Sequence, residues 1–103
     1  MLKLNSPPRE RPVPALRWSE EAVGDLSDIV DYIEERDPGA ADRLRADVAA
    51  TAEQFAERPY LYRPGRVAGT REALVTPNYL IVYQVGEAFV DVLRVLHTAR
   101  RYP

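Results

Sequence analysis

The amino-acid sequence predicts an α+β domain in the order β-α-α-β-β-β, with a helical hairpin packed on one face of a small, mainly antiparallel sheet. Between residues 20 and 57, apolar side chains recur at helical spacing, interrupted once by Asp37-Pro38-Gly39. After residue 70 the pattern changes to three short β-branched runs separated by turns. The chain has 103 residues, which is enough for a single domain.

The first 14 residues differ in composition from the rest of the chain. They hold four of the nine prolines, which lock the backbone in extended conformations and remove hydrogen-bond donors. We therefore expect residues 1–14 to form a flexible arm, and residues 15–103 to form the single folded domain. A leader without its own fold is favoured over an interaction tail.

Residues 15–19 predict a short strand that runs into the first helix. Ser19 is a good N-cap, and Glu20 and Glu21 place carboxylates at the positive end of the helix dipole. The predicted buried stripe consists of Ala22, Val23, Leu26, Ile29, Val30 and Ile33. The acidic side chains are expected on a solvated face, in preference to a site for a basic partner: Asp25, Asp28, Asp31, Glu34 and Glu35.

The second helix begins where the first pattern breaks. Asp37 can cap it and Pro38 suits the first helical position. Its apolar stripe consists of Ala41, Leu44, Val48, Ala52 and Phe55, and Arg58-Pro59 ends it. Because the connection between the two helices is short, they form an antiparallel hairpin.

The C-terminal half predicts three strands after a turn-rich entry over residues 59–67. These strands are expected over residues 70–75, 79–85 and 89–96. Their short connections favour an antiparallel meander. Both sides of the strands are apolar. One face of the sheet is therefore expected to pack against the helices, and the other face to be partly covered or to form a sticky apolar surface.

Composition limits the chemistry that the chain can perform. Without cysteine and with a single histidine, it lacks the usual ligands of a metal centre, so we expect no metal and no cofactor. No apolar run is long enough to span a membrane and no signal peptide is evident, which predicts a soluble cytoplasmic protein. The net charge is −2, yet residues 60–103 carry six arginines against three acids, which favours a binding face there.

The end of the last predicted strand carries the candidate chemistry. His97 and Tyr102 are candidates for proton transfer near a phosphodiester. The candidates for holding phosphate or contacting a target are Arg71, Arg94, Arg100 and Arg101. A purely structural role for a lone histidine at a strand end is the more common case. The alternatives are therefore a site at this end of the sheet or a last strand followed by a solvated tail.

Arg71 and Glu72 are neighbours on a predicted strand and therefore point to opposite faces of the sheet. One of them is expected to serve as a buried ion-pair partner. A structural role is favoured for Glu72, while for Arg71 the structural and ligand-binding roles are evenly balanced.

The ordered set of motifs resembles the RelE/ParE toxin superfamily, and its ParE-like branch in particular. The matching segments are residues 25–33 (DLSDIVDYI), Pro59, residues 66–72 (RVAGTRE), 78–83 (NYLIVY) and 94–103 (RVLHTARRYP). The resemblance covers about residues 15–103 and implies the fold given above. It also implies a toxin of a type II toxin–antitoxin module, which forms a hetero-oligomer with a cognate antitoxin.

The superfamily resemblance leaves three functions open. The first is a ParE-type inhibitor of DNA gyrase, which the acidic net charge and the near absence of lysine favour over a ribosome-docking nuclease. The second is a metal-independent, ribosome-dependent mRNA endonuclease, in which Arg71 and Arg94 would bind phosphate while His97 and Tyr102 would transfer protons. The third is an inactive protein that keeps the toxin fold as an interaction partner.

Overall fold

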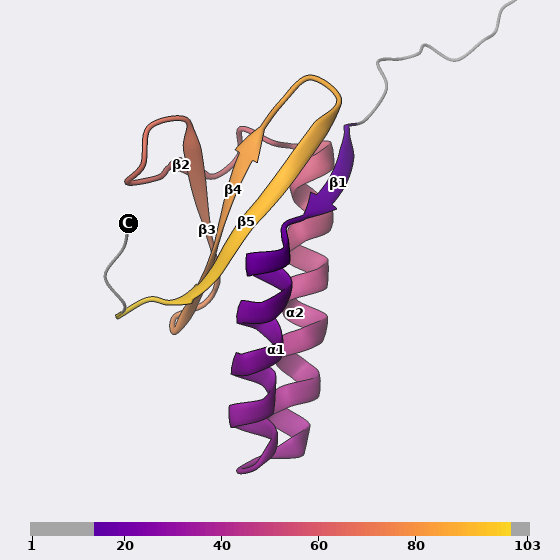
Figure 1. Cartoon of the computed structure of the whole chain (residues 1–103), viewed down its shortest axis with the longest axis vertical. Helices are drawn as coiled ribbons and strands as arrows, with labels where there is room; N and C mark the ends of the chain where they lie inside the picture. The colour runs from indigo at the N-terminus through magenta and orange to yellow at the C-terminus, as the bar shows by residue number, and fades with distance from the viewer. Residues whose placement is uncertain (1–13, 100–103) are drawn as a thin grey trace, which may run out of the picture.

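The computed structural model describes residues 14–99 (Figure 1). The predicted arm, apart from Pro14, and the candidates Arg100, Arg101 and Tyr102 lie outside these residues. The elements follow one another as β1 (Ala15–Trp18), α1 (Glu20–Glu34), α2 (Pro38–Glu57), β2 (Arg63–Pro64), β3 (Thr70–Thr76), β4 (Tyr79–Val85) and β5 (Phe89–His97). This order confirms the predicted succession of strand, helical hairpin and three strands.

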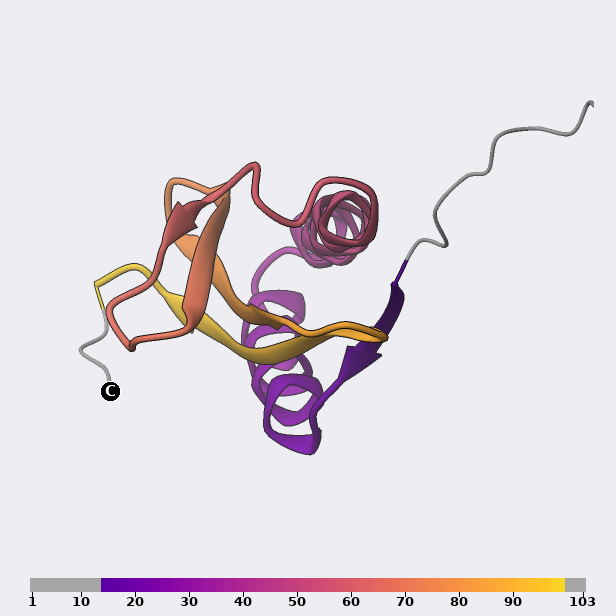
Figure 2. The same cartoon turned by 90° about the horizontal axis from the view of Figure 1, so that it is seen from above.

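The strands form one mixed sheet in the order β1-β5-β4-β3-β2. β1 pairs in parallel with β5, and the remaining pairs are antiparallel. Both helices contribute side chains to one core with β3, β4 and β5, and α1 lies against β5, as can be followed in the view from above (Figure 2). The two-residue strand β2 was not predicted, because the turn-rich segment that contains it has no alternating pattern.

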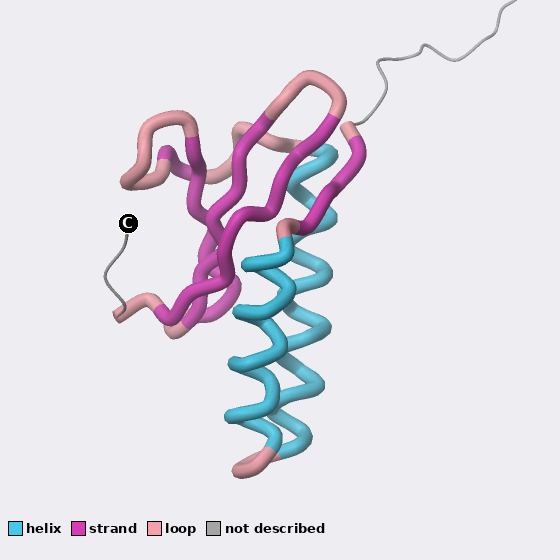
Figure 3. Tube along the Cα trace, in the orientation of Figure 1, coloured by secondary structure: helices cyan, strands magenta, loops and turns pink. Residues whose placement is uncertain are grey.

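The two helices begin at the residues that the sequence predicts. The Ser19 side chain accepts a hydrogen bond from the Ala22 amide, and the Asp37 side chain accepts one from the Ala40 amide. Each cap satisfies one backbone N–H that the first turn of a helix leaves without a partner. The hairpin formed by α1 and α2 extends well beyond the end of the sheet (Figure 3).

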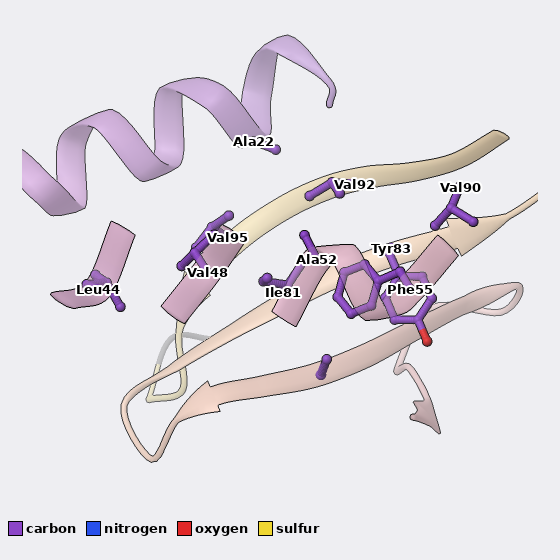
Figure 4. Close-up of a cluster of buried hydrophobic side chains, with 11 residues drawn as sticks. Ala22, Leu44, Val48, Ala52, Phe55, Ile81, Tyr83, Val90, Val92 and Val95 are labelled. Atoms are coloured by element: carbon purple, nitrogen blue, oxygen red, sulfur yellow. The ribbon is translucent and has the colours of Figure 1, made fainter. Parts of the chain in front are cut away.

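The main core lies between the hairpin and the sheet (Figure 4). Phe55 of α2 stacks on Tyr83 of β4, with ring centroids 3.9 Å apart. The Tyr83 hydroxyl donates to the Pro59 carbonyl over 2.6 Å, and burial raises the pKa of Tyr83 to about 12. One expectation for the α1 stripe is wrong: Val23 is 54% exposed, because it lines an open hollow with Leu26 of α1 and Arg45 of α2.

A smaller apolar cluster forms on the opposite face of the sheet. Leu80 and Val82 of β4 pack with Leu96 of β5, and all three are buried. Leu74 lies opposite Leu80 in the strand register but stays exposed. This face is therefore partly covered and partly open, as the apolar strands predicted.

Candidate functional site

The edge of β5 is completed by a helix as well as by a strand. β1 pairs with β5 only as far as Val92, whereas β5 continues to His97. Beyond that point the Ser19 hydroxyl donates to the Leu93 carbonyl over 2.9 Å, and the Val95 amide donates to the Asp25 carboxylate over 3.0 Å. We call this arrangement the α1–β5 seam. It satisfies backbone groups that an unpaired strand edge would leave open.

Arg94 belongs to this seam. Its guanidinium donates twice to Asp25, from Nε to Oδ2 over 2.7 Å and from Nη2 to Oδ1 over 3.0 Å. The side chain of Asp25 is only 14% exposed, and its hydrogen bond with Arg94 raises the arginine's pKa. The expectation that Asp25 lies on a solvated face is therefore wrong, because β1 is too short to pair with all of β5. Arg94, a predicted phosphate ligand, has its charge neutralised here by a neighbouring carboxylate.

Arg71 lies on the other side of the sheet centre and is half-buried. Its Nη1 donates to the Tyr62 carbonyl over 2.7 Å, and its Cζ lies 4.7 Å from the centroid of the Tyr60 ring. It lines a hollow of about 300 Å³ together with Tyr60, Pro64, Gly69, Thr70 and Val85. The backbone contact and the stacked ring hold the guanidinium in one orientation.

Glu72 points to the opposite face from Arg71, as predicted. It is 4% exposed and accepts hydrogen bonds from the Arg63 guanidinium over 3.1 Å and from the Arg66 amide over 3.2 Å. These contacts confirm the structural role of Glu72. They hold the segment between β2 and β3, where Gly69 adopts a φ of 84° that residues with a side chain rarely adopt.

His97 is exposed at the end of β5. Its Nδ1 accepts a hydrogen bond from the Ala99 amide over 3.1 Å, and its ring meets Tyr79 edge to face with centroids 5.2 Å apart. The histidine lines a hollow of about 410 Å³ together with Asp28, Ile29, Tyr32 and Tyr79. We call this the His97 hollow.

The strand register separates the predicted site residues. Arg71 pairs with Tyr83 on β4, whereas His97 pairs with Tyr79, four residues along the same strand. Four residues of strand correspond to about 13 Å. Within residues 14–99, the structure therefore does not bring His97 and Arg71 into one site, and Arg94 is bound to Asp25.

Sequence reasoning missed Asp25 and the aromatic walls of the His97 hollow. Asp25 had one detectable signal, since it lies three residues after Ala22 and four before Ile29, at the spacing of the apolar stripe. Tyr32 and Tyr79 had none, because their proximity depends on how α1 crosses the sheet.

The part of the chain from residue 14 to residue 99 holds no cluster of three metal-ligating side chains. Neither helix there is long and apolar enough to cross a membrane.

Solved structures place this fold among known toxins. The "Chromosomal ParDE TA system from P. aeruginosa" superposes with a TM-score of 0.75 at 21% identity, covering 82% of this chain and 96% of that one. The toxin–antitoxin complex RelBE2 of Mycobacterium tuberculosis gives a TM-score of 0.58 at 23% identity, covering 84% and 99%. The architecture is therefore the RelE/ParE toxin fold.

Sequence comparison identifies the family. Residues 16–102 match the family described as "ParE toxin of type II toxin-antitoxin system, parDE", and the chain belongs to that family. It is 36% identical to "Putative toxin Y4kP" of Sinorhizobium fredii over 85% of this chain and 92% of that protein. It is 38% identical to "Toxin RelE2" of Caulobacter vibrioides, over 81% and 93%.

Proposed function

We propose that this member of the ParE family is a growth-inhibiting toxin that acts on DNA gyrase and is neutralised by a cognate antitoxin protein. The family match supports the toxin role. The antitoxin is supported by relatives of the same fold that are named as toxin–antitoxin complexes. Gyrase and ribosomes are both cytoplasmic, so the proposal also places the protein in the cytoplasm.

The observation that favours gyrase over mRNA is that, within residues 14–99, the strand register separates Arg71 from His97 and the Arg94 guanidinium is bound to Asp25. Metal-independent RNA cleavage needs a proton-transfer group beside cations that stabilise the phosphate. Arg94 is instead paired with Asp25, and Arg71 is held by the Tyr62 carbonyl and the Tyr60 ring. This arrangement supports inhibition by binding, without catalysis. Arg71, Arg100 and Arg101 are then candidates for contacts with the target.

The second candidate is the ribosome-dependent mRNA endonuclease. One specific observation favours it, which is that a relative at 38% identity is named "Toxin RelE2". Under this alternative, His97 and Tyr102 would transfer protons. Its partners would be the ribosome and mRNA.

A supercoiling assay with purified, antitoxin-free chain tests the proposal. Gyrase, ATP and relaxed plasmid are incubated with increasing amounts of the chain, whose folding is checked by circular dichroism. We expect supercoiling to fall and linear DNA to accumulate as cleaved gyrase–DNA complexes are trapped. Undiminished supercoiling with a folded chain would refute gyrase as the target, and mRNA cleavage in a translation extract would then support the second candidate.

A further inference from the structure

The His97 hollow combines aromatic walls with a carboxylate that the fold does not use. Tyr32 and Tyr79 supply the phenol rings, and Asp28 supplies the negative charge. Within residues 14–99, Asp28 has no hydrogen-bond or ion-pair partner. Ile29 also lines the hollow and adds an apolar surface. None of these four side chains is among the residues proposed above to contact a target or to transfer protons.

This combination has a defined chemical preference. Aromatic rings attract cations through the negative potential of their faces, and a nearby carboxylate adds a charge-assisted hydrogen bond. A planar guanidinium satisfies both, because it can stack on a ring while its N–H groups reach a carboxylate. The apolar Ile29 surface suits the aliphatic stem that carries the guanidinium.

The protein itself shows that one of these rings accepts a guanidinium. The Arg36 Cζ lies 3.8 Å from the centroid of the Tyr32 ring, and Arg36 Nη1 donates to the Tyr32 carbonyl over 2.8 Å. Arg36 also lies 3.9 Å from the Glu35 carboxylate, which offsets its charge. Among the residues that the structure describes, the carboxylate of Asp28 is therefore the charged group that lines the hollow without a partner, and its charge is negative.

We propose that the His97 hollow is a docking site for an arginine side chain presented by a protein partner. The guanidinium stacks against the tyrosine rings and donates to the Asp28 carboxylate. The stem of the arginine lies on Ile29. The inference is independent of whether gyrase or mRNA is the target, because it rests on the geometry of this hollow alone.

Nuclear magnetic resonance of the full 103-residue chain tests the proposal with two matched probes. The first is acetyl-Leu-Arg-Leu-amide, and the second carries citrulline in place of arginine, which keeps the shape and removes the charge. We expect saturable shifts of the Ile29, Tyr32 and His97 amide resonances with the arginine peptide. Binding of the citrulline peptide is expected to be at least about threefold weaker, as the loss of a partly exposed charge pair and a cation–π contact implies.

Variants of exposed residues separate the site from general charge attraction. Asp28→Asn and Tyr32→Leu are each expected to weaken the arginine peptide by about threefold or more. The matched control is Asp31→Asn, which removes the same charge from the same helix but outside the hollow, and should change affinity by less than about twofold. Absence of saturable shifts up to the solubility limit, equal binding of citrulline, or equal effects of Asp28→Asn and Asp31→Asn would each overturn the proposal.

Discussion

Asp25 and Asp28 lie three residues apart on α1, yet their surroundings differ. Asp25 is mostly buried in the α1–β5 seam, where it accepts hydrogen bonds from the Arg94 guanidinium and the Val95 amide. Asp28 is exposed beside the His97 hollow and has no partner within residues 14–99. The same residue type thus closes the sheet edge in one place and leaves a charge available in the other.

The difference follows from the length of β1. Because β1 ends at Trp18, α1 must supply the groups that complete the next part of the β5 edge. Ser19 and Asp25 fall within reach of that edge, whereas Asp28 lies farther along the helix, beside the end of β5. Residues in the seam should therefore govern stability, and residues of the hollow should govern binding.

The largest effect is expected for Asp25→Ala. The change removes two hydrogen bonds to Arg94 and leaves the Val95 amide without its acceptor, which should cost about 3 kcal/mol of unfolding free energy. Urea unfolding measures the loss, with Asp31→Ala as the control on the solvated face. Equal losses for the two variants would contradict the assigned role of the seam.

Ser19→Ala is expected to have the next largest effect. It removes the N-cap of α1 and the hydroxyl that donates to the Leu93 carbonyl, for a loss of about 1.5 kcal/mol. The matched control is Ser27→Ala, an exposed serine inside the same helix, which should change stability by less than about 0.5 kcal/mol. If both variants unfold at the same urea concentration, Ser19 does not hold the seam.

The ion pair between Arg17 of β1 and Asp91 of β5 should make the free energy of unfolding depend on pH. The Arg17 Nε donates to Asp91 over 2.6 Å, and this hydrogen bond lowers the pKa of Asp91. A lowered pKa in the folded state stabilises the protein above the ordinary carboxyl pKa of about 4. The stabilisation by ionised Asp91 is lost as the pH falls through the lowered pKa of this carboxyl group.

The measurement is urea unfolding of the wild type and Asp91→Asn between pH 2 and 6. The difference between the two should be small, because the pair is exposed, and it should shrink towards low pH. It should also decrease in high salt, which screens exposed charges. A difference that does not change with pH would show that the pair makes no contribution through ionisation.

Asp28→Asn is expected to have the smallest effect on stability, about 0.5 kcal/mol or less, because the carboxylate has no partner within residues 14–99. The same substitution is expected to weaken arginine binding. A loss of stability comparable with that of Asp25→Ala would remove the distinction between the seam and the hollow. Thermal unfolding of the two variants side by side gives the comparison.

Local sequence signals predicted most of the fold. Ser19 and Asp37 cap the helices as expected, because a cap depends on neighbours within three residues. The parallel pairing of β1 with β5 was not predicted, since it joins segments separated by both helices and three strands. β2 was missed because two residues give no periodicity.

The candidate site was less predictable than the fold. The sequence identified Glu72 as structural, and the structure confirms this with its buried contacts to Arg63 and Arg66. The residue pattern also grouped His97 with Arg71 in one candidate site, although the strand register separates the two residues along β4. That separation depends on strand alignment, which residue types alone do not specify. The functional roles of all the candidate site residues stay predictions, and three of these residues, Arg100, Arg101 and Tyr102, also lie outside residues 14–99.

The most direct test of the account compares wild type and His97→Ala in the gyrase supercoiling assay. The account predicts that both proteins inhibit supercoiling and trap linear DNA at concentrations within about twofold of each other, since no proton transfer is needed. A nuclease that depends on His97 would lose about 100-fold or more on this substitution. The account would be contradicted if both folded proteins left gyrase unaffected while only the wild type cleaved mRNA in a translation extract.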